Sequence, residues 1–252
     1  MSILAYHMVD PRFYFGATRV TPSSFETQVR MIRDMRIPVR TLTDYLSTSD
    51  PERGLAITFD DGFQSVFQYA FPILERYHIK ATVFVIPAFT GQFNTWDVTF
   101  GTRARLMNWD ELGMLCRAGW EIGSHTLTHK DLRRISRSQR TRELQRSRNL
   151  LQQHLNTCSS VISFPFGNTD AAAVKDYLSA GYRNGVVLSE LSGGLDPEFN
   201  IGRQGVYLFD SLKRVRQKIT GQNKMMNRAL QRGIGWCSNA TVAVKEKEWQ
   251  IH

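Results

Sequence analysis

Residues 55–63 read LAITFDDGF. The run LAITF predicts a short buried strand, and two aspartates and a glycine follow it directly. Asp60 and Asp61 therefore lie at the carboxyl end of a strand, where parallel α/β proteins carry their functional loops. Adjacent residues at such a bend point in different directions, so one carboxylate can bind a metal while its neighbour faces a substrate. The alternative is that the pair caps the helix that follows.

Other short apolar runs are also typical of buried strands. They are residues 3–6, 81–86, 120–123, 161–164 and 185–188. Helical patterns lie between them, one opening at residues 22–25 and others at residues 64–77, 109–118, 136–155 and 171–180. Strands that alternate with helices predict an α/β fold with a parallel sheet, either closed or open.

The length of 252 residues fits one large domain, because α/β barrels commonly reach this size undivided. We expect a catalytic domain over residues 1–221 and a C-terminal extension over residues 222–252, where the alternation fades. Residues 87–107 lack a clear period. A loop of that length in a compact domain is usually functional, so we expect it beside a site.

A second informative stretch, GSHTLTH, occupies residues 123–129 and also follows a predicted strand. The spacing of His125 and His129 predicts that both imidazoles lie on one side of a helical turn, within reach of one ion. A surface histidine or a core histidine with a structural hydrogen bond is the alternative. Together with one of the aspartates, two histidines would bind a divalent ion and leave positions open for water and substrate. The other aspartate would then be a general base of a hydrolase.

At these residues the chain resembles the polysaccharide deacetylases of the NodB-homology type, carbohydrate esterase family 4. The family motif TFDDG stands at residues 58–62, and the motif H-(S/T)-x-x-H stands at residues 125–129. A third motif, R-x-P-Y/F, is matched only in part by residues 163–167, which read SFPFG. The resemblance covers roughly residues 1–220, and the first two motifs are specific in their order and spacing.

This resemblance implies a distorted (β/α) barrel of parallel strands and outer helices that removes acetyl groups from N-acetylated sugars. It implies that Asp60 is the general base and that Asp61, His125 and His129 bind a divalent metal ion, with zinc as the expected ion. Such an ion would polarise the amide carbonyl and lower the pKa of a water, while Asp60 takes the proton.

The resemblance also implies which groups stabilise the oxyanion and protonate the leaving amine. The backbone N–H of Phe166, beside Pro165, would help to hold the tetrahedral oxyanion. The general-acid histidine that usually lies near the C-terminus is not evident, but His7 stands on the first predicted strand in the context LAYH. A permuted branch, resembling the enzymes that de-N-acetylate poly-N-acetylglucosamine, places its acid histidine in such a context. This implies that His7 protonates the leaving amine, the alternative being a structural hydrogen bond at a strand end.

Ser163 is a departure from the family, which often has an arginine there that orients the catalytic aspartate. A serine cannot do this. Arg203 follows a late strand-like segment and could supply the charge from elsewhere, and an ordinary surface arginine is the alternative. We also count Arg203 among the candidate substrate contacts, with Pro165 and with Trp96 of the long loop. The aromatic residues of that loop, together with Trp109 beside it, either stack on sugar faces or pack the loop.

The net charge is +9, and the excess lies largely in residues 130–149 and in the C-terminal third. A basic surface attracts nucleic acid, anionic lipid or acidic polysaccharide, and a solvated helix face is the alternative. No aromatic residues interleave with the arginines of residues 130–149, so we expect no nucleic-acid partner and keep peripheral contact with a membrane. The first residues, MSILAYHMVD, carry no basic n-region. We therefore expect a cytoplasmic location, at the inner face of the membrane.

The sequence thus predicts a metal-dependent hydrolase that removes N-acetyl groups from an N-acetylhexosamine-containing glycan or glycan intermediate. Three alternatives stay open. A hydrolase of O-acetyl esters would use the same machinery, and a hydrolase of small cyclic amides would share the fold. A non-catalytic glycan-binding relative would need a decayed site, whereas Asp61, His125 and His129 are all present. The sequence leaves the oligomeric state open.

Overall fold

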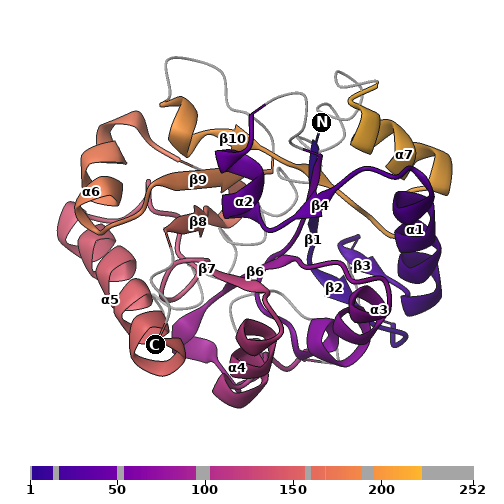
Figure 1. The fold of residues 1–252 in the computed structure, drawn as a ribbon. Coiled ribbons are helices and arrows are strands. Elements are labelled where there is room, and N and C mark those ends of the chain that lie inside the picture. Colours follow the sequence, from indigo (N-terminus) through magenta and orange to yellow (C-terminus); the bar gives the residue numbers. More distant parts are fainter. Residues whose placement is uncertain are drawn as a thin grey trace.

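A parallel sheet curves into a nearly closed barrel, and helices surround it (Figure 1). The computed structural model describes residues 2–13, 17–49, 54–94, 103–156, 160–167, 169–188 and 196–222. Within these residues the strands run in the order β10-β9-β8-β7-β6-β5-β1-β11, and β4 pairs with β5. The barrel predicted from the sequence is confirmed. Most of the predicted C-terminal extension, residues 223–252, lies outside the described residues.

The strands of the barrel differ strongly in length. They are β1 (Ser2–Tyr6), β4 (Val39–Arg40), β5 (Leu55–Phe59), β6 (Thr82–Val85), β7 (Glu121–Ser124), β8 (Val161–Ser163), β9 (Asn184–Val187), β10 (Ile201–Gly202) and β11 (Gln204–Gly205). A separate pair is formed by β2 (Met8–Val9) and β3 (Arg19–Val20). The runs predicted from the sequence became β1, β5, β6, β7, β8 and β9. The strands that the sequence did not indicate have two residues each, too few for a period to be read.

The helices lie outside the barrel except α2 (Figure 1). They are α1 (Pro22–Asp34), α2 (Leu42–Ser47), α3 (Phe71–Arg76), α4 (Trp109–Arg117), α5 (Arg137–Leu155), α6 (Val174–Ser179) and α7 (Leu212–Thr220). A π-helical turn over Val66–Ala70 precedes α3, so the helical pattern predicted over residues 64–77 is not one regular helix. Ser136 and Gln139 form the capping box that starts α5. Among the described helices none is both long and apolar enough to cross a bilayer.

Helix α2 covers one end of the barrel, as its position in front of the strands in Figure 1 shows. The N–H of Leu42 donates to Thr82 Oγ1 at 2.8 Å, and Glu121 accepts from Thr43. Because Thr82 and Glu121 begin their strands, α2 sits over the amino-terminal ends. Leu42 and Tyr45 are buried there against the barrel interior. Helix α2 does not cover the opposite end of the barrel, where the strands have their carboxyl ends and where the candidate site residues lie.

The chain itself joins the two edges of the sheet. Strand β10 pairs with β9 at one edge, β11 pairs with β1 at the other, and only Arg203 separates β10 from β11. The N–H of Arg203 donates to the Val187 carbonyl at 2.9 Å, so the backbone continues the edge before it crosses to β1. This crossing aims the Arg203 side chain at the barrel interior, where it lies over the Phe84 ring.

Candidate metal centre and active site

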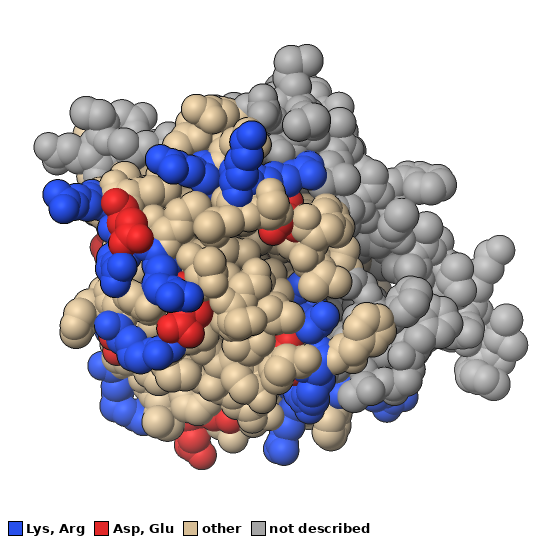
Figure 2. Space-filling view, turned by 90° about the vertical axis from the view of Figure 1, so that its right-hand side faces the viewer, with Lys and Arg blue, Asp and Glu red and all other residues tan. Residues whose placement is uncertain are grey.

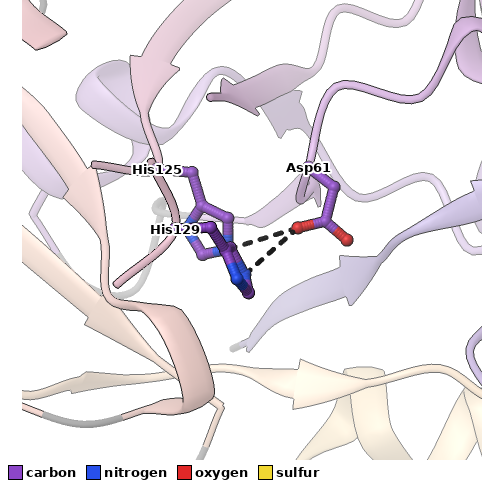
Figure 3. Close-up of side chains that lie close together, drawn as sticks. All are labelled: Asp61, His125 and His129. Carbon is purple, nitrogen blue, oxygen red and sulfur yellow. Dashed lines mark ion pairs between the residues drawn. The ribbon is translucent and has the colours of Figure 1, made fainter. Parts of the chain in front are cut away.

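Asp61, His125 and His129 converge at the carboxyl ends of the strands (Figure 3). Asp61 Oδ1 lies 3.5 Å from the Nε2 atom of His125 and 3.5 Å from that of His129. The ligand atoms of all three residues lie within 4.8 Å of one another, in largely buried positions. Zinc binds histidine nitrogen and carboxylate oxygen at 2.0–2.2 Å, so two ligands of one tetrahedral ion are about 3.4 Å apart. The donor set and its spacing therefore fit a divalent metal ion.

The backbone reaches this arrangement through left-handed conformations. Asp61 has φ 69° and Gly62 has φ 70°, so the chain turns sharply as it leaves β5. Thr126 and His129 have φ 64° and 62°. His125 and His129 thus lie on an irregular loop, and the helical turn expected from their spacing is wrong. Their imidazoles still meet, because the loop folds back over the end of β7.

Hydrogen bonding fixes the tautomer of His125. Its Nδ1 lies 2.7 Å from the Ser163 carbonyl, which can only accept, so Nδ1 carries the proton and Nε2 offers a lone pair toward Asp61. Burial lowers the pKa of His125 and lowers that of His129 well below its ordinary value. The lowered pKa values favour neutral imidazoles near pH 7, so the contacts to Asp61 drawn in Figure 3 suit a candidate set of metal ligands better than charge pairs.

The neighbouring Asp60 faces the other way and is held by Arg203. Arg203 Nη1 donates to Asp60 Oδ1 at 2.8 Å, and Nη2 donates to Oδ2 at 2.7 Å. The same guanidinium donates to Thr58 Oγ1 at 3.0 Å and to Ser163 Oγ at 2.8 Å. Only 1% of Arg203 is exposed, so the alternative of a surface arginine is wrong. Both carboxylate oxygens of Asp60 bind this arginine, so Asp60 does not serve as a cap of the helix that follows.

This pairing decides the charge of Asp60. Burial alone raises the pKa of its carboxyl. The charges of Arg203 and His125, the hydrogen bonds from Arg203 and the charge of His7 together lower that pKa by more. The result is a pKa well below the usual range. Asp60 is therefore ionised at neutral pH, fixed in orientation and adjacent in sequence to the candidate metal ligand Asp61.

His7 reaches the same end of the barrel from β1. It connects β1 to β2, and its charge influences the pKa of both Asp60 and His129. Pro165 and Phe166 follow β8, and the Phe166 ring lies 4.9 Å from the His129 ring. Phe166 has φ 60° and ψ 10°, a left-handed conformation that costs a non-glycine residue energy and is found where surroundings enforce it. These residues surround the metal centre, and their individual roles stay predictions.

The long loop after β6 is described at its two ends only. Phe93 and Arg105 form an antiparallel bridge, and the buried Asn94 side chain accepts from the Ala104 N–H at 2.9 Å. Trp96 lies outside the described residues. Trp109 stacks on His154 of α5 with ring centroids 4.2 Å apart, so it packs α4 against α5, which neither alternative for the aromatic residues had named.

Two side chains of the site hold Arg203, a role that was not predicted for them from the sequence. Thr58 lies two residues before Asp60 on the same face of β5, and Ser163 ends β8 on the interior side. Both accept hydrogen bonds from the Arg203 guanidinium and so fix it from two different strands of the barrel. The alternation of strand faces was a signal for Thr58. At position 163 the sequence indicated only that the family's arginine is missing, and it did not predict that the serine hydroxyl accepts a hydrogen bond from Arg203.

Comparison with known proteins agrees with this geometry. A family model described as polysaccharide deacetylase matches residues 47–185. The protein YxkH of Bacillus subtilis is 27% identical over 221 residues, which span 86% of this chain and 71% of that protein. The poly-beta-1,6-N-acetyl-D-glucosamine N-deacetylase of Staphylococcus epidermidis is 25% identical over 183 residues. This match covers 68% of the present chain and 62% of the staphylococcal enzyme, less than two thirds of its length.

Solved structures show the same fold. The Streptococcus pyogenes deacetylase PplD in complex with acetate has a TM-score of 0.73 at 23% identity, covering 87% of this chain and 97% of that one. IcaB from Ammonifex degensii has a TM-score of 0.70 at 22% identity, covering 86% and 96%. At these identities the likeness concerns the fold, and the chemistry depends on the residues described above.

Proposed function

Since this chain belongs to the polysaccharide deacetylase family, we propose that it is a metal-dependent hydrolase that removes N-acetyl groups from an N-acetylhexosamine-containing glycan or glycan intermediate. One observation carries the proposal: an ionised Asp60, held by Arg203, adjoins Asp61, which converges with two neutral histidines. A base beside a set of metal ligands is the arrangement that hydrolysis of an unreactive amide needs.

Asp61, His125 and His129 would hold the ion, and their nitrogen and oxygen donors suit Zn²⁺. A bound divalent ion supplies a Lewis acid that polarises the acetyl carbonyl and makes water more acidic. The buried histidines contribute by staying neutral, because a protonated imidazole has no lone pair to offer an ion.

Asp60 would take a proton from the attacking water as its oxygen bonds to the acetyl carbon. The bidentate contact with Arg203 keeps the carboxylate in one orientation, and Thr58 and Ser163 keep the arginine in place. The backbone N–H of Phe166 would donate to the developing oxyanion. His7 would then protonate the sugar nitrogen as the C–N bond breaks, which releases acetate and a free amine.

The N-acetylated substrate is favoured by the match to a poly-beta-1,6-N-acetyl-D-glucosamine N-deacetylase. O-acetyl esters remain the second candidate class because an ester needs the same attack on an acetyl carbonyl. Small cyclic amides and sugar binding without turnover are less consistent with a complete set of Asp61, His125 and His129.

Acetate release from a panel of N- and O-acetylated glycans, with zinc and with a chelator, tests the proposal. We expect release from an N-acetylhexosamine oligomer that chelation abolishes and zinc restores. Release from O-acetyl substrates alone would transfer the assignment to the esterase. Activity on a cyclic amide and on no glycan, or glycan binding without any release, would refute it.

The basic surface suggests where such a protein works. Figure 2 shows the side of the molecule that carries α1 and α7, where blue Lys and Arg side chains, with red Asp and Glu side chains among them, surround a mostly uncharged centre. A groove of about 670 Å³ between these helices is lined by Arg30, Arg33 and Arg216, with Met31 and Leu212 among its apolar residues. Charge of this kind supports peripheral contact with anionic lipid. Sedimentation with vesicles that contain phosphatidylglycerol, compared with neutral vesicles, tests it, and cell fractionation tests the cytoplasmic location.

A further inference from the structure

Glu143 is a buried carboxylate that the proposed chemistry does not use. It lies on α5 and is 6% exposed. Its Oε1 accepts from Thr128 Oγ1 at 2.6 Å, and its Oε2 accepts from the Thr128 N–H at 2.8 Å. A carboxylate is costly to bury unless hydrogen bonds compensate, so both of these contacts are needed where it lies. Both lead to the residue that immediately precedes His129.

The loop that carries His125 and His129 needs such support. Left-handed φ values at Thr126 and His129 are unfavourable for residues with a Cβ, so the surroundings must hold them. Other contacts hold the first part of the loop: the His125 N–H donates to the Val85 carbonyl at 2.7 Å, and the Thr126 N–H donates to Ser124 Oγ at 3.2 Å. Glu143 holds the second part, next to His129.

Helix α5 supports both parts of the loop from one face. Ser147 lies four residues after Glu143, and its hydroxyl accepts from Ser124 Oγ at 3.0 Å. Residues four apart on a helix are neighbours, so Glu143 and Ser147 present adjacent side chains to the loop. The capping box at Ser136 fixes the start of the same helix. The metal-ligand loop is thus attached to a rigid element of the fold.

We propose that Glu143 is a positioning residue for the metal centre, which clamps Thr128 and so fixes His129 in its ligand position before an ion binds. The inference rests on the proposed metal-dependent function. Groups behind metal ligands typically change metal affinity by 10–100-fold when they are removed. Glu143 acts through Thr128 rather than on an imidazole directly, so we expect an effect of about 10-fold, at the lower end of that range.

The chain offers a matched control at the other end of the barrel. Glu121, at the start of β7, accepts from the N–H and the hydroxyl of Thr43 in the same two-point manner. It also accepts from Thr82 Oγ1 at 2.8 Å. Glu121→Gln therefore disturbs the same chemistry at the far end of the strand that leads to His125.

The experiment measures zinc affinity by competition with a chromogenic chelator for Glu143→Gln, Glu121→Gln and the unchanged chain. Thermal unfolding of the metal-free proteins is recorded alongside. We expect zinc affinity to fall about 10-fold for Glu143→Gln and to change less than about 3-fold for Glu121→Gln. Equal losses in the two variants, or an unchanged affinity in Glu143→Gln, would overturn the inference.

Thr128 gives an independent route if Glu143→Gln does not fold. Thr128→Val removes the hydroxyl that donates to Glu143, whereas Thr128→Ser keeps it. We expect Thr128→Val to weaken zinc binding and Thr128→Ser to bind as the unchanged chain does; the same affinity in both would contradict the clamp. An unchanged chain that neither binds zinc nor releases acetate would refute the proposed function itself, which separates the two failures.

Discussion

Arg203 and Asp60 form a bidentate pair inside the barrel although 143 residues separate them in the chain. Arg203 lies at the point where the backbone passes from one edge of the sheet to the other. The residue that completes the barrel is therefore also the residue that orients the candidate base. This links the closure of the fold to the chemistry, since a displaced edge would displace the guanidinium.

Replacing Arg203 by methionine should lower kcat/KM by at least about 10²-fold, because the base loses its orientation and part of its charge stabilisation. Breaking a buried pair also costs about 3–5 kcal/mol of stability. Steady-state acetate release and urea unfolding measure the two effects. Arg203→Lys keeps a charge but not the two-point contact, so it should be intermediate in activity. Full activity in either variant would contradict the orienting role.

Exchanging the residues at positions 163 and 203 tests whether the guanidinium that orients Asp60 must come from position 203 or can also come from β8. Ser163 Oγ accepts from Arg203 Nη2 at 2.8 Å, so an arginine placed at 163 begins beside the guanidinium site. We expect Ser163→Arg combined with Arg203→Ser to recover a measurable part of the activity that Arg203→Ser alone loses. No recovery, with the double variant folded by circular dichroism, would show that the guanidinium must come from Arg203.

Local patterns predicted the parallel α/β fold and the candidate site residues at its strand ends, whereas the closed barrel was implied by the family resemblance. Buried strands such as β5 are continuous apolar runs, and Asp60 and Asp61 mark the end of one. Closure of the barrel depends instead on strands of two residues, whose pairing is decided by distant partners. For this reason Arg203 could be proposed from the sequence as one alternative, but its contact with Asp60 could not be derived.

The histidine loop illustrates a different limit. A spacing of four residues predicts a helical turn, yet left-handed backbone at Thr126 and His129 brings the imidazoles together in another way. Contacts with α5 stabilise that backbone, and they involve Glu143, which reads in the sequence as one acidic residue among arginines. Local spacing indicated His125 and His129 as candidate ligands, and the structure brings them together with Asp61, but the spacing could not give the conformation that does so.

The roles of Asp60 and Asp61 should become distinguishable when each residue is changed to asparagine. Asp60→Asn keeps the ligand set, so zinc should still bind while acetate release falls by about 10²–10⁴-fold. Asp61→Asn removes a charged ligand, so zinc affinity and activity should fall together. Calorimetric zinc titration alongside the acetate assay distinguishes the two. Loss of zinc binding in Asp60→Asn with retention in Asp61→Asn would reverse the assignment.

His7→Gln should affect amide substrates more than activated esters. An amine leaves only when protonated, whereas a nitrophenolate leaves without help, so the loss of a general acid is expressed in the first case. We expect acetate release from an N-acetylhexosamine oligomer to fall about 10²-fold or more and 4-nitrophenyl acetate hydrolysis to change little. Equal losses on both substrates would indicate that His7 serves the structure of the site rather than proton transfer.

Gly123 on β7 leaves room for the Phe84 ring. This ring lies against the guanidinium of Arg203, which binds Asp60. A Cβ at Gly123 would lie 2.6 Å from two atoms of the Phe84 ring, and the Arg203 guanidinium lies 5.4 Å from the centre of that ring. Gly123→Ala should therefore displace Phe84, destabilise the protein by about 1–3 kcal/mol and lower kcat through Arg203. Gly113→Ala in α4 is the control, because its Cβ would meet only the end of the flexible Arg117 side chain.

If the effect passes through Phe84, a smaller residue there should relieve it. Phe84→Leu alone leaves a cavity, but together with Gly123→Ala it should cost less stability than the sum of the two single changes. Urea unfolding of the four proteins of this cycle gives the coupling energy, and acetate assays show whether kcat follows. Additive losses would mean that Gly123 is needed for another reason, and an unchanged kcat in a destabilised Gly123→Ala would show that Phe84 does not support the arginine.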